Sequence, residues 1–181
     1  AISLRLVGSE MCIRDSNTHE HLEVISRTIE VANGRISVVA GTGSNSTEET
    51  LHQTKEAESL GADACLLVTP YYNRPTQEGL YAHFKKVAET TSVPLVLYNV
   101  PGRTGCDLLP ETIGRLSSIE GIVGIKEASG KIERVSEIRS VSASDFFILS
   151  GEDALTLEMM NNGAVGTISV SYTHLTLPTT R

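Results

Sequence analysis

Short apolar runs alternate along the chain with longer segments in which apolar residues recur every three or four positions. The short runs are rich in β-branched residues and are continuously apolar, which is typical of parallel strands buried on both faces. Several of the longer segments begin with helix-starting residues, as at Ser46 and Pro110. The pattern predicts strands over 36–41, 64–70, 94–101, 121–128, 145–151 and 164–170, and helices over 18–32, 47–60, 77–91, 110–117, 131–141 and 153–162.

Two α/β architectures fit this order of elements, a doubly wound open sheet and a (β/α)8 TIM barrel. Glycine and polar residues follow the carboxyl end of nearly every expected strand, as at Gly41, Asn99 and Lys126. Residues from successive strand ends that converge on one face favour the barrel. A complete barrel has eight strands and about 250 residues, so we expect an incomplete one here, with about six of the eight strands and without the C-terminal helices.

The two ends of the chain do not follow the pattern. Residues 1–16 have no clean period, and residues 171–181 stop where a strand-to-helix connection is expected. Both segments resemble translated adapter sequence. The predicted organisation is a non-native segment at 1–16, a partial TIM-barrel catalytic domain at 17–170 and a second non-native segment at 171–181.

Composition narrows the classes of function. The formal net charge of −7 and pI of about 5.2 argue against nucleic acid as a partner, because phosphate binding needs a positive stripe. No apolar run approaches the roughly 18 residues that span a bilayer, so no membrane partner is expected. The 3 cysteines are widely spaced and lack a C-x-x-C pair, which indicates a reducing, cytoplasmic compartment.

Lys126 is the unusual residue of the stretch GIVGIKEASG, because an ammonium group ends an otherwise apolar strand. Side chains alternate between the faces of a strand, so Lys126 is expected to share a face with Gly124, which leaves room beneath it, and with Ile122. Burial in a barrel penalises the ammonium form, and a neutral amine can attack a carbonyl to form a Schiff base. The alternative is a lysine that extends to water. Glu127 alternates to the opposite face and is expected to pack against the helices.

Tyr98 and Arg103 favour the chemical interpretation of the lysine. Tyr98 ends the preceding strand at a matching position, where a phenol can move protons during imine formation, although a core tyrosine is the alternative. Arg103 follows in the loop NVPGRTG, and a guanidinium there suits a carboxylate. A surface arginine is the alternative, and Arg74 offers a competing cation.

The segments VTPYYNRPTQEGLY, LYNVPGRTGCDLLPETIGRL, GIKEASG and LSGEDALTLEMM together resemble the 4-hydroxy-tetrahydrodipicolinate synthase (dihydrodipicolinate synthase) family, of the class I pyruvate aldolase and sialic acid lyase superfamily. The resemblance runs from about 17 to 170. It implies a lyase that condenses pyruvate with L-aspartate 4-semialdehyde through a lysine Schiff base, in diaminopimelate and lysine biosynthesis. No metal or dissociable cofactor is implied, and the chain shows no cluster of ligand residues.

The same resemblance implies three catalytic residues. Lys126 would form the imine with pyruvate, and Tyr98 would donate and accept protons. Tyr72 would complete a proton relay by entering the neighbouring site across a tight dimer, within a homo-oligomer that is expected to be a tetramer.

Three further residues are implied in substrate binding. Arg103 would hold the carboxylate of aspartate semialdehyde, while Gly151 and the backbone of Ile168 would shape the pyruvate pocket. The arginine of NVPGRTG separates the synthases from the sister lyases.

A regulatory site is also implied, because many members of the family are inhibited by lysine at the dimer interface. Four residues fall on positions that resemble that site: His21, Asn45, Glu49 and Tyr71. The alternative is that Asn45 and Glu49 only begin a helix.

One loop departs from the family pattern. The family carries Gly-Thr-Thr-Gly-Glu-Ser after its second strand, and this loop falls here on residues 8–13, with Ser9 and Glu10 in place of the threonines. We therefore expect this chain to be inactive. Two alternatives stay open: a sister pyruvate aldolase or lyase of the sialic acid lyase or keto-deoxy-gluconate aldolase type, and a non-catalytic barrel that acts as a binding module.

Overall fold

Parallel strands form a single curved sheet in the computed structural model, which describes residues 4–7 and 17–169. The described strands pair in chain order, each with the next, so the sheet runs from β1 to β7 without a crossover. They are β1 (Leu4–Val7), β2 (Ser37–Gly41), β3 (Ala64–Val68), β4 (Leu95–Asn99), β5 (Ile122–Glu127), β6 (Phe147–Ser150) and β7 (Gly166–Thr167).

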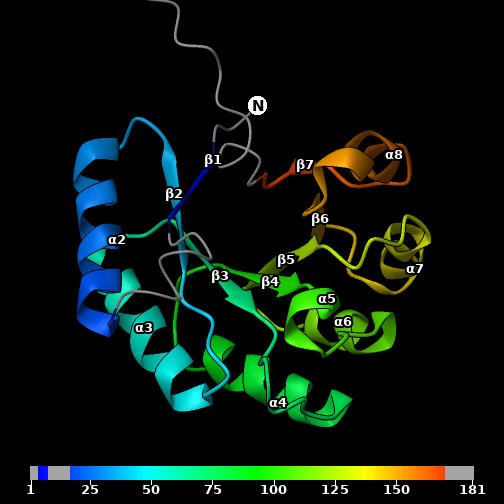
Figure 1. Ribbon diagram of the computed structural model, residues 1–181, viewed down its shortest axis with the longest axis horizontal. Helices are drawn as coiled ribbons and strands as arrows, with labels where there is room; N and C mark the ends of the chain where they lie inside the picture. Colours follow the sequence, from blue (N-terminus) through cyan, green and yellow to red (C-terminus); the bar gives the residue numbers. More distant parts are fainter. Residues whose placement is uncertain (1–3, 8–16, 170–181) are drawn as a thin grey trace, which may run out of the picture.

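Helices connect the strands and lie on the outer face of the arc (Figure 1). They are α2 (Thr18–Ala32), α3 (Thr47–Leu60), α4 (Gln77–Ala88), α5 (Pro101–Thr104), α6 (Pro110–Leu116), α7 (Glu133–Val141) and α8 (Thr156–Asn161), with a short 3₁₀ turn at Asp153–Leu155 before α8. Caps set several of the boundaries. The Asn17 side chain accepts a hydrogen bond from the Glu20 amide at the start of α2, and Gly61 ends α3 at a φ of 93°.

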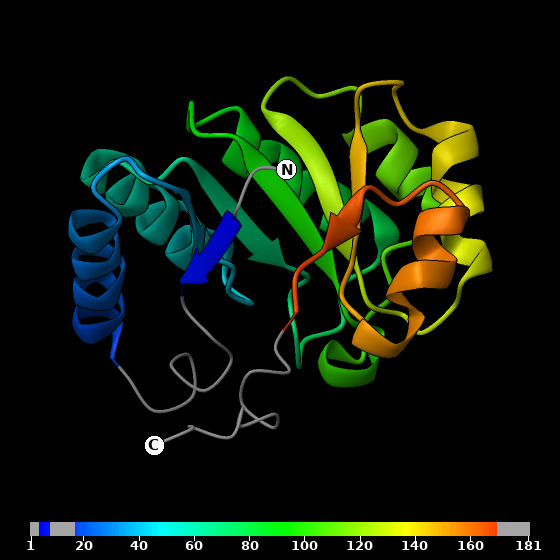
Figure 2. The same ribbon diagram turned by 90° about the horizontal axis from the view of Figure 1, so that it is seen from above.

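The expected architecture is confirmed as an incomplete (β/α)8 barrel. Within the described residues β1 and β7 do not pair with each other, so the sheet remains an open arc (Figure 2). The six strands expected from the sequence are all present. The hydrophobic pattern does not predict β1, although Leu4 to Val7 pair in parallel register with Ser37 to Ala40 of β2.

Alternating side chains of the strands divide the core into two parts. Leu97 and Ile125 point outward and pack in the main cluster with helix residues such as Leu80 and Phe84. A smaller cluster lines the concave face: Val39, Leu66, Val96, Tyr98, Val100, Ala128, Leu149 and Ile168. The concave cluster includes Tyr98, so that side chain lies inside the arc, as expected.

The alternation expected for β5 is wrong at its first residues. Val96 of β4 pairs with Gly124, whereas Leu95 pairs with Ile122, so one extra residue, Val123, bulges between these pairs. The bulge turns Ile122 into the outer cluster, and it does not lie beneath the lysine. The room at Gly124 is taken by Phe147, because a Cβ there would lie 2.4 Å from the phenyl ring.

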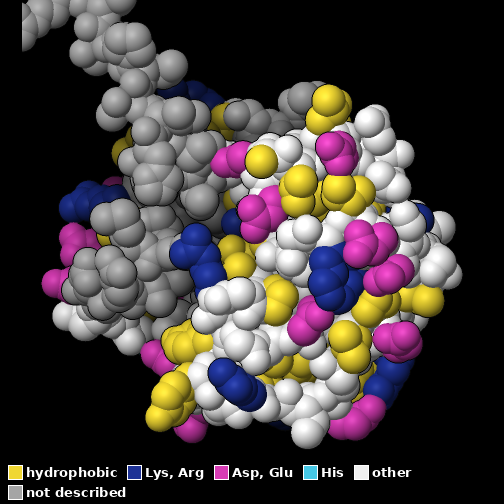
Figure 3. Space-filling view, turned by 45° about the vertical axis from the view of Figure 1, so that its right-hand side comes forward, with side chains coloured by type: hydrophobic (Ala, Val, Ile, Leu, Met, Phe, Trp, Pro, Cys, Tyr) yellow, Lys and Arg dark blue, Asp and Glu magenta, His cyan; other side chains and the backbone are white. Residues whose placement is uncertain are grey.

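Charged side chains of both signs are interspersed on the face shown in Figure 3, which carries no continuous basic stripe among the coloured residues. Within residues 4–7 and 17–169, no helix is long and apolar enough to cross a membrane.

Candidate active site

Lys126 and Tyr98 meet on the concave face at the carboxyl ends of β5 and β4. The two residues are paired in the parallel register, so their side chains leave the sheet at the same height. The Lys126 Nζ lies 4.2 Å from the centroid of the Tyr98 ring, within the range of a cation–π contact. Lys126 is only 2% exposed, so the interpretation of a lysine that extends to water is wrong.

Gly151 lies directly against the lysine. A Cβ at this position would stand 2.9 Å from Lys126 Cε and 2.7 Å from Ala128 Cβ. The Gly151 amide donates a hydrogen bond of 2.8 Å to the Glu127 carbonyl oxygen, which fixes this close approach. The absence of a side chain at Gly151 therefore leaves room for the lysine chain.

Ile168 lies in the concave cluster with Tyr98 and is 8% exposed. Its amide donates to the Ser150 carbonyl oxygen at 2.9 Å, and this bond places residue 168 beside the end of β6. The structure thus brings Ile168, Gly151, Tyr98 and Lys126 to the carboxyl ends of neighbouring strands.

Arg103 is exposed on α5, a single helical turn that follows β4 directly. The sequence predicts only a loop here. The turn forms because Pro101 occupies its first position and Gly105 ends it in the left-handed region, at a φ of 67°. The side chain of the competing cation, Arg74, lies against Gly105, since a Cβ there would stand 3.0 Å from Arg74 Nε.

Tyr72 extends from the loop after β3 and is 90% exposed. Its φ of 71° lies in the left-handed region, which is strained for a residue with a side chain. The side chain of Asn73 secures the loop by donating to the Asn45 carbonyl oxygen at 3.1 Å. Tyr72 therefore does not join Lys126 and Tyr98 within this chain. The Gly-Thr-Thr position at residues 8–13 lies outside the described residues.

A buried polar network lies behind the two strand ends, on the opposite face of the sheet. Asn99 and Glu127 are both 0% exposed and are paired in the register directly after Tyr98 and Lys126. The Asn99 amide donates to Glu127 Oε2 at 3.1 Å and to Asp107 Oδ1 at 2.9 Å. Arg134 on α7 donates two hydrogen bonds of 3.0 Å to the Asp107 carboxylate.

Burial and hydrogen bonding shift the pKa values of the two carboxyl groups of this network in opposite directions. Burial raises the pKa of Glu127, against hydrogen bonds from Ser129 and Asn99 that lower it. Burial also opposes ionisation of Asp107, but hydrogen bonds from Arg134 and Asn99 outweigh it and hold the pKa of Asp107 below its usual value. Glu127 faces the helix layer as predicted, and it is hydrogen-bonded there, not only packed.

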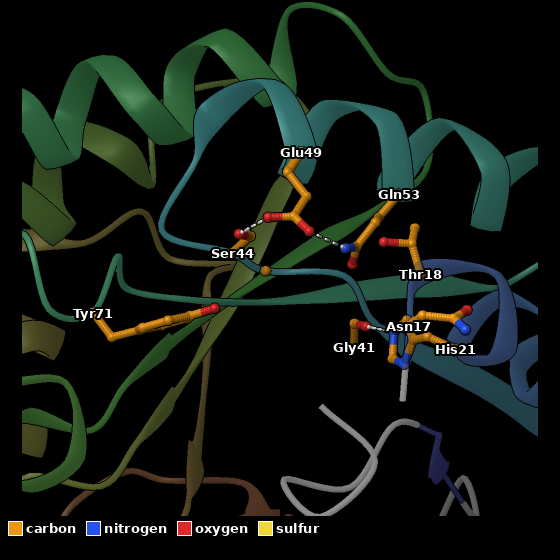
Figure 4. A pocket seen from close by; sticks show the side chains of 9 residues that line it. Asn17, Thr18, His21, Gly41, Ser44, Glu49, Gln53 and Tyr71 are labelled. Atoms are coloured by element: carbon orange, nitrogen blue, oxygen red, sulfur yellow. Dashed lines mark hydrogen bonds between the residues drawn. The ribbon is translucent and has the colours of Figure 1, made fainter. Parts of the chain in front are cut away.

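Three of the four residues of the expected lysine site line one small pocket of about 90 Å³ between α2 and α3 (Figure 4). The His21 Nε2 atom lies 2.7 Å from the Gly41 carbonyl oxygen, and the Tyr71 hydroxyl points toward the pocket. The Glu49 carboxylate accepts hydrogen bonds from Ser44 Oγ and from Gln53 Nε2. The fourth residue, Asn45, is not among those that line it.

The described residues hold no group of three or more His, Cys, Asp or Glu side chains that could bind a metal ion. The thiols of Cys65 and Cys106 are both buried and free, and burial raises the pKa of Cys65 to about 11. Neither thiol is therefore a good nucleophile, and Lys126 is the stronger candidate.

Sequence reasoning missed Asn99, Asp107 and Arg134. A signal for Asn99 is present, because it and Glu127 are polar residues at matching ends of two apolar strands. The partners on the α5–α6 connection and on α7 carry no such signal, since only the fold brings them to the sheet.

Successive parallel βα units, with a buried lysine at a strand end, define the chain as part of a (β/α)8-barrel protein. The model of the dihydrodipicolinate synthetase family matches residues 7–177. The chain therefore belongs to the dihydrodipicolinate synthetase family.

Curated relatives agree with this assignment. A 4-hydroxy-tetrahydrodipicolinate synthase of Methylococcus capsulatus is 58% identical over 152 residues, which are 84% of this chain and 52% of that protein. The synthase of Escherichia coli O9:H4 is 54% identical over 155 residues, 86% of this chain and 53% of that protein. The chain spans about half the length of the curated relatives it matches.

Solved structures agree in fold. Dihydrodipicolinate synthase from Aquifex aeolicus superposes with a TM-score of 0.91 at 44% identity, over 94% of this chain and 59% of that one. The enzyme from Acinetobacter baumannii, in complex with pyruvate, gives 0.90 at 48% identity, with 94% and 59% covered. The enzyme from Cyanidioschyzon merolae, with lysine bound, gives 0.89 at 40% identity, with 93% and 58% covered.

Proposed function

We propose that the whole protein to which this chain belongs is a 4-hydroxy-tetrahydrodipicolinate synthase, which condenses pyruvate with L-aspartate 4-semialdehyde in the diaminopimelate route to lysine. The observation that carries the proposal is the buried Lys126 amine, 4.2 Å from the centre of the Tyr98 ring at the carboxyl ends of two barrel strands. The pyruvate bound to the A. baumannii enzyme supports this substrate.

The first step is imine formation on Lys126, with no other cofactor. The neutral Nζ attacks the keto carbon of pyruvate, and the carbonyl oxygen takes up a proton. The resulting carbinolamine loses water, so the C–O bond breaks as the C=N bond completes. Tyr98 supplies and recovers the protons, because its phenol leaves the sheet at the same height as the amine.

The next step forms a carbon–carbon bond. Loss of a proton from the pyruvate methyl group gives an enamine, which attacks the aldehyde carbon of aspartate semialdehyde. Arg103 holds the carboxylate of the incoming aldehyde, since α5 carries it, exposed, next to the end of β4. Gly151 and Ile168 line the end of the site that holds pyruvate.

Tyr72 acts in a second copy of the chain. Its 90% exposure and left-handed backbone suit a side chain that is held away from its own subunit in order to enter a partner. The assembly is a tight dimer, with a tetramer as the larger form. The cytoplasm is the compartment, in keeping with the free thiols of Cys65 and Cys106.

Lysine is the proposed inhibitor. His21, Glu49 and Tyr71 offer acceptor groups around the small pocket of Figure 4, and Asn45 belongs to the loop beside it. A carboxylate and carbonyl oxygens suit ammonium groups. The lysine bound to the C. merolae enzyme supports this ligand.

A condensation assay tests the activity. The whole protein is incubated with pyruvate and either aspartate 4-semialdehyde or a sugar-derived aldehyde, and pyruvate consumption is followed. We expect turnover with aspartate semialdehyde and a large loss of turnover in Arg103→Ala. Turnover only with the sugar aldehyde would assign the chain to a sister lyase. Failure of both aldehydes to react, in a folded protein, would favour a binding module.

A further inference from the structure

Asn99 is the central residue of the polar network behind Lys126 and Tyr98. Its amide nitrogen donates to Glu127 and to Asp107, and its Oδ1 accepts a hydrogen bond of 3.0 Å from the Leu108 amide. Both amide hydrogens are therefore used, in a place with 0% exposure. A buried polar side chain with all its partners in place has a single favourable orientation.

The Leu108 and Asp107 contacts close the base of a loop. The chain leaves β4 at Asn99, forms α5 with Arg103, and returns to the Asn99 side chain at residues 107 and 108. One side chain thus ties the start of this loop to its end. Its position fixes where α5 stands relative to the sheet.

Glu127 makes the corresponding contact after the lysine. Its Oε1 accepts a hydrogen bond of 2.7 Å from the Ser129 amide, and its Oε2 accepts from Asn99. The carboxylate therefore connects the end of β4, the end of β5 and the turn that follows Lys126.

The network is anchored on α7. Arg134 is 4% exposed, and its guanidinium makes a two-point contact with Asp107 and a 3.3 Å hydrogen bond to the Leu108 carbonyl oxygen. Two parallel hydrogen bonds fix the orientation of the Asp107 carboxylate relative to the Arg134 guanidinium as well as the distance between them.

We infer that Asn99 and Glu127, anchored through Asp107 by Arg134, are positioning residues that set the relative placement of Tyr98, Lys126 and Arg103. The inference rests on the proposed function for the roles of those three residues. Asn99 directly follows Tyr98 in β4, and Glu127 directly follows Lys126 in β5. Each positioning residue points to the face of the sheet opposite its reacting neighbour. A shift in the Asn99–Glu127 contact moves the Tyr98–Lys126 pair with it.

The test compares Asn99→Ala with Arg134→Lys and with Ile138→Val. Arg134→Lys keeps the positive charge but loses the two-point contact. Ile138→Val is a matched control, since Ile138 is a fully buried residue of the same helix that does not join the network. For each folded variant, we measure the melting temperature and the rate at which borohydride traps pyruvate on Lys126.

Positioning predicts a trapping rate that falls by up to about 100-fold in Asn99→Ala and falls less in Arg134→Lys. Ile138→Val lowers the melting temperature but leaves the trapping rate unchanged. If Asn99→Ala does not fold, Arg134→Lys decides the question. An unchanged rate in the folded network variants would overturn the inference, and so would a rate in Ile138→Val that falls as far as theirs.

A second readout separates this inference from the proposed function. The pH midpoint for acetylation of Lys126 by acetic anhydride needs no pyruvate. If the unchanged protein traps no pyruvate, the proposed function fails, and the acetylation midpoint then tests the network. The midpoint is expected to move in Asn99→Ala and to stay fixed in Ile138→Val. Equal midpoints in the unchanged protein, Asn99→Ala and Ile138→Val would contradict the positioning role.

Discussion

Replacing Gly151 by alanine places a methyl group against the reacting lysine. The added Cβ would stand 2.9 Å from Lys126 Cε and 2.7 Å from Ala128 Cβ. Carbon atoms in favourable contact lie about 3.5 Å apart or more, so the two contacts are too short by roughly 0.6 Å and 0.8 Å. The Ala128 methyl group and the strand backbone cannot rotate away, whereas the lysine chain can. The strain against Lys126 is therefore relieved by moving its side chain, whereas the strain against Ala128 needs a shift of the backbone.

A displacement of this size is large on the scale of catalytic geometry. Misplacing a reacting atom by about 1 Å can cost about 100-fold in rate, so a shift of roughly 0.6 Å is expected to slow imine formation by about 10-fold or more. Overpacking a core also costs about 1–3 kcal/mol in the free energy of unfolding. The rate of imine formation and the stability should therefore both fall.

The assay follows borohydride trapping of pyruvate by mass spectrometry and unfolding by denaturant titration. Gly166→Ala is the matched control, because its Cβ would meet Leu149 at an ordinary contact distance of 3.5 Å. We expect slow trapping only in Gly151→Ala. If both variants trap pyruvate at the original rate, the close approach of residue 151 to the lysine does not control the reaction.

Three further changes have expected outcomes. Gly124→Ala puts a Cβ 2.4 Å from the Phe147 ring, so its free energy of unfolding should fall by about 1–3 kcal/mol; no loss in denaturant titration would contradict the contact. Burial lowers the pKa of His83 from 6.5 to about 4. Between these two pH values the His83 imidazole is therefore protonated in the unfolded chain and neutral in the folded chain. Stability should therefore fall as pH drops from about 6.5 to about 4, by up to about 3 kcal/mol. His83→Gln should flatten this pH dependence, whereas the same change at the exposed His52 should not. If the stability of the two variants depends on pH in the same way, protonation of His83 is not the cause of the loss. Tyr98→Phe keeps the ring beside the amine but removes the proton carrier, so condensation should slow by about 100-fold or more in the folded variant. A rate close to the original would remove Tyr98 from proton transfer.

The order of elements could be predicted from the sequence because parallel barrel strands are continuously apolar and are separated by helices with a clear period. The same rule failed where the local backbone departs from regularity. The bulge at Val123 reverses the face of Ile122, and nothing in the apolar string IVGI marks it. The strand at Leu4–Val7 was missed since its stability comes from pairing with β2, and it carries no periodic signal of its own.

The candidate site could be predicted in part for the same reason. Lys126 and Tyr98 end neighbouring strands, so their matching height follows from strand order alone. The polar network could not be found this way, because Arg134 reaches Asp107 only after α7 packs beside α6. The role of Gly151 is also tertiary, since its closeness to the lysine depends on how β6 lies beside β5.

Covalent trapping shows whether Lys126 forms an imine with pyruvate. The folded whole protein and this chain are each incubated with pyruvate and borohydride, and the added mass is located by peptide mapping. We predict one reduced pyruvate on Lys126, none in Lys126→Gln, and weaker or no trapping in this chain. No adduct in the folded protein, or an adduct on a different lysine, would rule out Lys126 as the residue that forms the Schiff base.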